Sequence, residues 1–354
     1  MWRFVLRRII WSIPVILLLI FTVFALMRAL PGGPFDFAGD KSLPKAVSDN
    51  LKRRYHLDWP LHLQFSSYLM GDDVTHAICR ALPVVPGCDL VLASSNLDVS
   101  KGVIRGDLGM AMRQRGRTVN DIISESFPIS LQLGIMAILF GLLLGIPLGT
   151  LAALRQNTAV DYLASFFAVL GLSIPSLVLG PLLIWIFALK LGWLPVSTWG
   201  AKPPFLLGFI PIPTADFVLH AILPVTALGV ALTASIARLT RASLLQVIGE
   251  DYIRTARAKG LPGRILVVRH ALRNSLIPVV TILGPLTAGV VTGSFITEFI
   301  FGIPGMGKHF ITSISNRDYS LISGATLVYA LILVLANLTV DILYAWLDPR
   351  IRYD

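Results

Sequence analysis

The chain has 354 residues, of which 55% are hydrophobic and 14% charged, and its formal net charge at pH 7 is +10. A soluble globular domain carries about a quarter charged residues, so this composition excludes an ordinary soluble protein and indicates one built largely inside a membrane. The positive charge favours contact with anionic membrane lipid, and no stretch of the chain resembles a nucleic-acid-binding module.

Six runs without charged side chains predict membrane-spanning helices, because a bilayer crossing needs about 20 apolar residues. They cover 9–27, 126–154, 162–189, 217–237, 275–297 and 321–340. The second and third runs exceed one straight crossing and contain Pro128, Pro147, Pro175 and Pro181, which predicts tilting or kinking. We expect the last helix to continue to Trp346. The sequence therefore predicts an all-α polytopic membrane protein with six transmembrane helices and a large extracytoplasmic segment after the first.

Residues 1–30 are predicted to form a cytoplasmic N-terminus and the first transmembrane helix. The bases Arg3, Arg7 and Arg8 would also suit the start of a cleaved signal peptide. The apolar stretch is longer than the roughly 7–15 residues usual in such a peptide, however, and no clear small-residue cleavage site follows. We therefore expect this helix to be retained.

Residues 31–125 are the one segment large enough to form structure outside the bilayer. An amphipathic stretch from about Pro44 to Tyr55 predicts one helix there, and Leu61 to Leu69 is a second helical candidate. Cys79 and Cys88 lie in the same segment. In an oxidising compartment we predict that they form a disulfide closing a small loop, and two free or buried cysteines are the alternative.

Residues 126–347 are predicted to form a core of five transmembrane helices. Glycines four residues apart recur in the second and fifth of the six spans, where small residues let helix backbones approach closely. They are Gly141, Gly145 and Gly149, and Gly289 and Gly293. Static helix packing is the interpretation we favour, and a sliding interface is the alternative. Asp341, near Asn337 and Tyr344, is either a structural hydrogen-bonding group, which we favour, or a functional buried carboxylate.

The loop at 238–274 is predicted to hold a short helix with well-defined ends. Its first turn carries two acids and its last turn two bases, as the helix dipole favours. These are Glu250, Asp251, Arg257 and Lys259. Gly260 suits a left-handed residue just past the end, and Pro262 prevents continuation. About ten residues of helix are marginally stable alone in water, so we expect this helix to dock against a partner.

The basic residues of the short loops predict the orientation of the chain. If the N-terminus is cytoplasmic, six spans return the C-terminus to the same side, and 348–354 form a cytoplasmic tail. The cytoplasmic segments then hold Arg3, Arg7, Arg8, Arg155, Arg350, Arg352 and the bases between Arg238 and Arg273. The short outer loops hold Lys190, Lys202, Lys308 and Arg317. This asymmetry predicts that both termini are cytoplasmic.

No motif in the chain predicts catalysis or a bound cofactor. Residues 302–308 match G-x-x-x-x-G-K, but His309 stands where a phosphate-binding loop needs Ser or Thr, and the piece follows a membrane span instead of a strand. Neither H-E-x-x-H nor G-x-S-x-G occurs. The histidines and cysteines have no four-ligand spacing, so no metal site is predicted. We expect a chain that is not itself an enzyme.

A series of motifs runs along nearly the whole chain. It includes MRALPGGPF, GDLGMAM, ALRQNTAVDY, EDYIRTARAKGLPGRILVVRHALRNSLIPVV, ITEFIFGIPGMGK and DPRIRY. Together and in this order, these motifs resemble those of the peptide and nickel permeases of bacterial ABC importers. The resemblance is nearest to the oligopeptide permease B subunits, with the dipeptide permease B subunits next.

The resemblance implies a type I importer permease in the bacterial inner membrane. Its implied partners are a second homologous permease, two ATP-binding subunits that bind ATP and Mg, and an extracytoplasmic substrate-binding protein that delivers a peptide. In this family a coupling helix of the cytoplasmic loop docks into a cleft of an ATPase subunit. The implied contacts here are Glu250, Asp251, Tyr252, Arg254, Thr255, Ala256, Arg257, Lys259 and Gly260. ABC importers in general carry Glu-Ala-Ala in this loop, where this chain has Arg254-Thr255-Ala256.

The resemblance leaves the substrate open, because the family also includes permeases for dipeptides, nickel complexes, glutathione and peptide-like antibiotics. RQNTAVDY and PGGPFDF favour the oligopeptide branch. A secondary transporter would show inverted repeats, broken helices and charges inside the spans. A receptor would not need the helix of the basic loop, and neither class is favoured. Residues 72–105 look like an insertion relative to typical members, with no role assigned.

Overall fold

A computed structural model of the chain describes residues 2–29, 33–35, 44–94, 100–114 and 116–347. The side-chain surroundings of residues 2–5, 285, 288, 291–293, 340–341 and 343–347 are outside that description. The predictions made for Gly293, Asp341, Tyr344 and the tail at 348–354 therefore fall outside the described part of the structure.

The described residues are mainly helical, and β pairing among them consists of two isolated bridges. The first part of the chain comprises α1 Trp2–Ala29, α2 Lys45–Arg54, α3 Leu61–Met70, α4 Asp72–Ala81, α5 Cys88–Ala93 and η1 Val103–Arg105. The helices α6 Val119–Leu154, α7 Ala159–Ser173, α8 Ser176–Leu183, η2 Ile184–Lys190 and α9 Ala215–Ile248 follow. The remainder is α10 Asp251–Ala258, α11 Gly263–Ile265, η3 Leu266–Ala271, α12 Leu272–Ser275, α13 Ile277–Ile300, α14 Met306–Asn316 and α15 Tyr319–Leu347.

Five helices of the described chain are long and apolar enough to cross a bilayer, and the bent pair of α7 with α8 and η2 can supply a sixth. These elements overlap the six predicted runs, so the prediction of an all-α chain with six spans is confirmed. The predicted extension of the last span is also confirmed, because α15 ends at Leu347.

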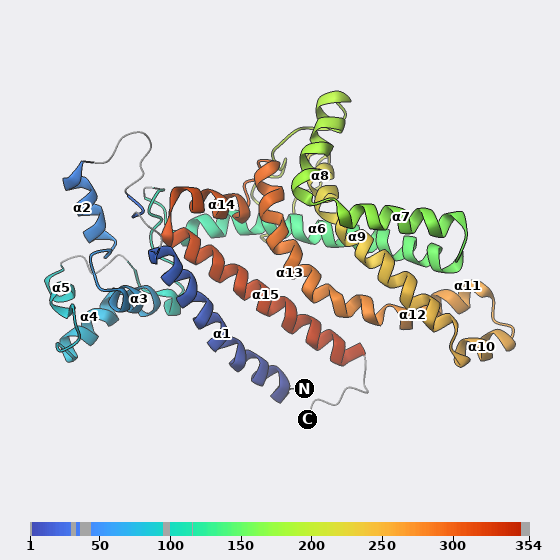
Figure 1. The fold of residues 1–354 in the computed structure, drawn as a ribbon, viewed down its shortest axis with the longest axis horizontal. Helices are drawn as coiled ribbons and strands as arrows, with labels where there is room; N and C mark the ends of the chain where they lie inside the picture. The colour runs from blue at the N-terminus through green and yellow to red at the C-terminus, as the bar shows by residue number, and fades with distance from the viewer. Residues whose placement is uncertain (1, 30–32, 36–43, 95–99, 115, 348–354) are drawn as a thin grey trace. The chain divides into compact units, whose positions relative to one another are not determined.

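The third span is broken where Ile174 and Pro175 separate α7 from α8. The two halves are bent by 104°, and Figure 1 shows α8 turning sharply away from α7. Pro175 lacks a backbone N–H and disfavours helical backbone at the preceding residue. Ile174 accordingly has extended backbone, with φ −91° and ψ 113°. The kink predicted for this run is confirmed, whereas α6 continues as one helix through Pro128 and Pro147.

The chain divides into two compact units, the first centred on Pro128–Lys308. Its apolar core gathers side chains from α6, α9 and α13 around the buried Leu133, Phe217 and Val290. Trp199, in the loop before α9, is buried in this core. Its indole Nε1 donates to Gln132 Oε1 at 2.7 Å, and its ring packs edge-on against Phe217. This loop is therefore a structural part of the unit.

The second unit comprises Trp11–Phe127 and His309–Ala330. Two of its helices, α2 and α3, match the two helices predicted in this segment to within about two residues at each end. The carboxylate of Asp318 is buried there. It accepts backbone N–H groups from Met112 at 3.1 Å and Arg113 at 3.0 Å, and from Leu321 at 3.2 Å in the first turn of α15. The loop that leads to α6 is thus fixed to the start of α15.

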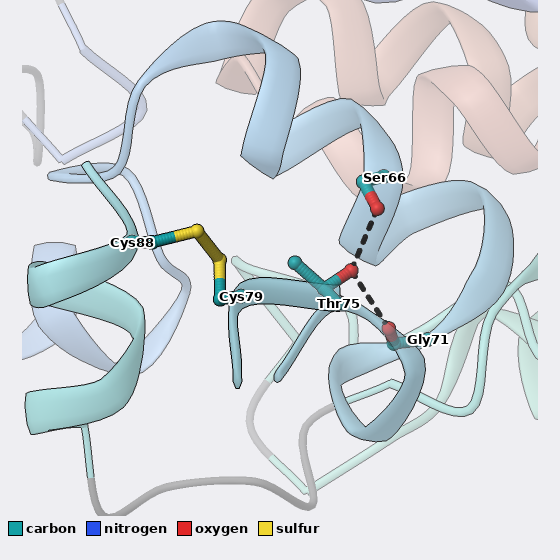
Figure 2. Close-up of a disulfide and its surroundings, with 5 residues drawn as sticks. All are labelled: Ser66, Gly71, Thr75, Cys79 and Cys88. Carbon is teal, nitrogen blue, oxygen red and sulfur yellow. Dashed lines mark hydrogen bonds between the residues drawn. A yellow bond between two sulfur atoms is a disulfide. The ribbon is translucent and has the colours of Figure 1, made fainter. Parts of the chain in front are cut away.

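Among the described residues of 72–105, the segment predicted to be an insertion, the helices are α4, α5 and η1. Cys79, near the end of α4, is joined by a disulfide to Cys88, the first residue of α5 (Figure 2). Nearby, Thr75 Oγ1 donates to the carbonyl of Gly71 at 3.0 Å and shares a hydrogen bond of 2.9 Å with Ser66 Oγ of α3. The two cysteines are fully buried in a small cluster with Trp59, Leu63 and Val91. Residues 72–105 therefore share a small buried core with Trp59 and Leu63.

An ion pair also links the two ends of residues 72–105. Arg105 Nη1 lies 2.6 Å from Asp73 Oδ2, and both side chains are about half exposed. The hydrogen bond from Arg105 holds the pKa of Asp73 below its usual value. Exposed pairs of this kind contribute little to stability, so the buried cluster and the disulfide dominate.

When the purified protein is unfolded without reduction, an alkylating reagent is expected to modify neither Cys79 nor Cys88. Replacing both cysteines by serine should lower the stability of this segment by roughly 2–3 kcal/mol, since the bridge closes a short loop. Mass spectrometry after alkylation in denaturant counts the free thiols, with a reduced sample as the control. Two alkylated cysteines without prior reduction would contradict the disulfide.

Candidate functional site

The helix predicted in the basic loop is α10. Glu250 precedes it with extended backbone and makes no side-chain cap hydrogen bond, and Asp251 opens its first turn. Gly260 lies just past its end with φ +77°, and its N–H donates to the carbonyl of Arg257 at 3.0 Å. A Cβ atom at Gly260 would meet nothing within 4 Å. Glycine is therefore required there by backbone conformation and not by crowding.

One face of α10 is fixed to the chain by apolar packing. Ile253 is fully buried and Ala256 half-buried. They belong to one cluster with Ala153 of α6, Leu244 of α9, and Leu266 and Ala271 of η3. Burying an isoleucine side chain contributes about 1.5–3 kcal/mol, so this cluster attaches α10 firmly to the spans on either side of it. Ala256, predicted as a partner contact, is half-buried against this cluster.

The opposite face of α10 is exposed and mostly polar or charged. It presents Asp251, Tyr252, Arg254, Thr255, Arg257 and Lys259. The phenol of Tyr252 is held by Asn274, whose Nδ2 donates to it at 2.8 Å. The ion pair between Arg254 and Asp251, at 3.4 Å, is exposed and contributes little by itself. An exposed tyrosine among arginines is typical of protein–protein contact surfaces, so this face suits a protein partner.

The first three predicted packing glycines lie on the face of α6 that contacts α9. A Cβ at Gly141 would lie 2.8 Å from Leu232 Cβ, and one at Gly145 2.9 Å from Ile236 Cβ. At Gly149 it would collide with the carbonyl oxygen of Ala237. The close approach of α6 and α9 therefore depends on the absence of side chains at these positions.

The fourth predicted packing glycine has different surroundings. Gly289 of α13 is exposed, and a Cβ there would meet nothing within 4 Å. Its spacing from Gly293 resembles that of the α6 glycines, but the close approach seen at those glycines does not recur at Gly289 among the described residues.

A part-buried ion pair that the sequence did not predict joins α7 to α9. Arg241 donates from Nε to Asp161 Oδ1 at 2.5 Å and from Nη2 to Oδ2 at 2.7 Å. Asp161 also accepts the backbone N–H of Asn157 at 3.0 Å, and its side chain is 3% exposed. Two parallel bonds of this kind fix both distance and orientation. The pair ties the start of α7 to the part of α9 that leads into α10.

A second unpredicted group is Glu298 of α13, whose side chain is fully buried. Its Oε2 accepts the backbone N–H of Gly307 at 2.7 Å, in the first turn of α14. The neighbouring N–H of Met306 donates to Ser130 Oγ at 2.8 Å. A Cβ at Gly305 would collide with the Glu298 carboxylate, so the glycines of this loop make room for it.

The position of Glu298 explains why residues 302–308 resemble a phosphate-binding loop. Glycine-rich backbone at a helix start offers N–H groups to an anion. Here that backbone faces a carboxylate of the same chain and follows a helix instead of a strand. Among the described residues, no group of three or more His, Cys, Asp or Glu side chains could hold a metal ion.

Comparison with sequence families supports a membrane transport component. A profile described as "Binding-protein-dependent transport system inner membrane component" matches residues 145–353. A second profile, for the N-terminal part of such components, matches residues 1–86.

Curated relatives match over the full length. The oligopeptide transport system permease protein OppB of Haemophilus influenzae is 37% identical over 353 residues, which covers 100% of each chain. The protein of the same name from Salmonella typhimurium is 39% identical over 354 residues, again with 100% of each chain covered. The dipeptide transport system permease protein DppB of Bacillus subtilis is 40% identical over 351 residues, covering 99% of this chain and 98% of that one.

A solved structure shares the fold at much lower sequence similarity. It is the MetNI methionine ABC transporter in an inward-facing conformation, which aligns with a TM-score of 0.51 and 17% identity. The alignment covers 64% of this chain and 96% of that chain.

Proposed function

The chain belongs to the binding-protein-dependent transport system inner membrane components, as a permease subunit of an ABC importer, and we propose that it forms half of a translocation pathway for oligopeptides. A second, homologous permease supplies the other half, and an extracytoplasmic substrate-binding protein delivers the peptide. The chain lies in the bacterial inner membrane with both termini in the cytoplasm, an orientation supported by the basic residues of its short loops.

The names of the relatives support a peptide substrate. Two full-length relatives at 37% and 39% identity are named as oligopeptide permeases. The Bacillus subtilis relative, at 40% identity, is named as a dipeptide permease, so dipeptides are the second candidate. Identity alone does not separate the two, and the motifs RQNTAVDY and PGGPFDF favour oligopeptides.

The surface proposed to receive the ATPase is the exposed face of α10. Two ATP-binding subunits carry ATP and Mg, and this chain contributes no catalytic group. The observation that carries the proposal is the division of a helix of eight residues into a buried apolar face and an exposed charged one. Ile253 and Ala256 pack in one cluster against α6, α9 and η3. A displacement of the exposed face of α10 is therefore transmitted to these three elements.

The mechanism we propose is alternating access. ATP binding draws the two ATPases together and moves their docked helices, and the membrane cavity then opens outward to the substrate-binding protein. Hydrolysis resets the inward-facing arrangement. The Asp161–Arg241 pair keeps α7 and α9 together during this motion, because its two parallel hydrogen bonds fix both distance and orientation.

Gentle purification of the tagged chain, followed by mass spectrometry of what co-purifies, tests this function. We expect two ATPase subunits, a second six-span permease and a peptide-binding protein. Lys259→Glu on the exposed face of α10 should lose the ATPase subunits and keep the second permease. The matched control is Lys202→Glu, which reverses an exposed lysine in the loop before α9.

The two variants distinguish an ATPase contact at α10 from a contact elsewhere on the chain. Loss of ATPase in Lys259→Glu but not in Lys202→Glu supports the α10 contact. Equal ATPase recovery in both variants would move the contact elsewhere on the chain. Recovery of the chain without any of these subunits, under conditions that preserve other ABC complexes, would contradict the importer assignment.

A further inference from the structure

An apolar groove runs along α7 in the first unit, bounded by α6 and α9. Its cavity has a volume of about 570 Å³. Thr233 carries the one hydroxyl among its lining side chains, and that hydroxyl donates to the carbonyl of Gly229 at 2.9 Å. Leu163 and Phe167 line its mouth and are exposed. A groove of this volume and lining suits a hydrocarbon ligand.

A second cavity, of about 210 Å³, continues this groove toward the end of α9. The two share Leu148, Ala164, Ala168 and Ala237. The second cavity differs in having polar and charged side chains in its lining, namely Ser165, Arg238 and Arg241. The apolar groove therefore has one basic end.

The charge at this end comes from Arg238. Arg241 is neutralised by its bidentate pair with Asp161. Arg238 is exposed and makes no hydrogen bond or ion pair within the described part of the chain. One uncompensated positive charge thus stands where the apolar groove ends, which suits a ligand with a single anionic group.

The position of Arg238 along α9 agrees with the depth of a lipid headgroup. The charge-free part of α9, residues 217–237, rises about 30 Å, which is the thickness of the hydrocarbon core. Arg238 follows directly, at the interface on the side of the basic loop. The cytoplasmic leaflet, where basic residues predict this end to lie, is the one rich in anionic lipid.

From these observations, we propose that the groove along α7 binds one anionic phospholipid. Its acyl chain occupies the apolar cavity, and its phosphate accepts hydrogen bonds from Arg238. A peptide fits this cavity poorly, because its backbone amides would find no partners among the lining side chains. An apolar helix of another chain would fill the groove but leave Arg238 without a counter-charge. A phospholipid satisfies both parts with one molecule.

Native mass spectrometry of the intact transporter tests the proposal. The complex is stripped of lipid and exposed to phosphatidylglycerol or to phosphatidylcholine with the same acyl chains. We expect the wild type to retain phosphatidylglycerol preferentially. Arg238→Gln should weaken phosphatidylglycerol retention about tenfold, as expected for a lost charged hydrogen bond, and remove the preference. Ala164→Trp, which fills the junction of the two cavities, should reduce retention of both lipids.

The control is Arg269→Gln, which removes an exposed arginine of η3 that does not line either cavity. It should retain phosphatidylglycerol as the wild type does. Retention unchanged by Arg238→Gln, or reduced equally by Arg269→Gln, would overturn the proposal. So would loss of the second permease from the Ala164→Trp complex with lipid retention intact, because the groove would then be a subunit interface. The inference does not depend on the transported substrate.

Discussion

Gly260→Pro is expected to abolish uptake of the transported peptide while the protein remains in the membrane. The backbone of Gly260 has φ +77°, whereas proline fixes φ near about −65°. Proline also removes the N–H that bonds to the carbonyl of Arg257. The end of α10 must therefore rearrange, and its exposed face changes direction relative to the packed Ile253. We expect uptake to fall at least about tenfold. A tenfold fall requires the contacts of α10 with its partner to weaken by only about 1.4 kcal/mol.

Gly260→Asn serves as the matched control. Asparagine tolerates the left-handed region better than other side chains, and the space around Gly260 is open. We expect this variant to keep most of the uptake. Immunoblots of membranes establish that each variant is present, and ATPase assays of the purified complex detect hydrolysis without transport. Normal uptake in Gly260→Pro at a normal membrane level would contradict the coupling role of α10.

Gly149→Ala is expected to destabilise the chain, although alanine normally favours a helix. The new Cβ would collide with the carbonyl oxygen of Ala237 and lie 2.8 Å from Thr240 Cβ. Because backbone is the main obstacle, α6 and α9 must separate, and overpacking of this kind costs about 1–3 kcal/mol. The unfolding midpoint of the detergent-solubilised protein should fall by several degrees.

Gly289→Ala is the matched control, because the same substitution at this position meets open space. Replacing an exposed helical glycine by alanine stabilises a helix by about 0.5–1 kcal/mol, so the midpoint should stay level or rise. Equal losses at both positions would contradict the assignment of close packing to the α6 glycines alone. A loss of assembly in Gly289→Ala, with an unchanged midpoint, would mean that another chain covers this face.

Much of the fold could be predicted because the bilayer limits it to helices of known length. The six spans, the continuation of α15 and the break at Pro175 follow from hydropathy and proline chemistry. The helix α14 was missed, since eleven residues between two spans have neither the length nor the uniform hydropathy that marks a crossing. The same limit applied to α4 and α5, whose core depends on a disulfide and on contacts distant in sequence.

The candidate site was predictable where it depends on local chemistry. The end of α10 at Gly260 followed from helix-capping preferences. The Asp161–Arg241 pair was missed because both residues lie just outside charge-free runs and were read as loop residues. The sequence signal that could have suggested the pair is the opposite charge of Asp161 and Arg241 at corresponding ends of two spans. Glu298 was missed for a similar reason, since the fifth run stops one residue before it.

The carboxylate of Glu298 has a consequence for ligand competition. It is tethered to the loop it binds through eight intervening residues, so its effective concentration at the N–H group of Gly307 is in the millimolar range or above. A free phosphate or nucleotide would have to displace a resident anion that never diffuses away. A glycine-rich sequence that resembles a nucleotide site is in this way occupied by a carboxylate of its own chain.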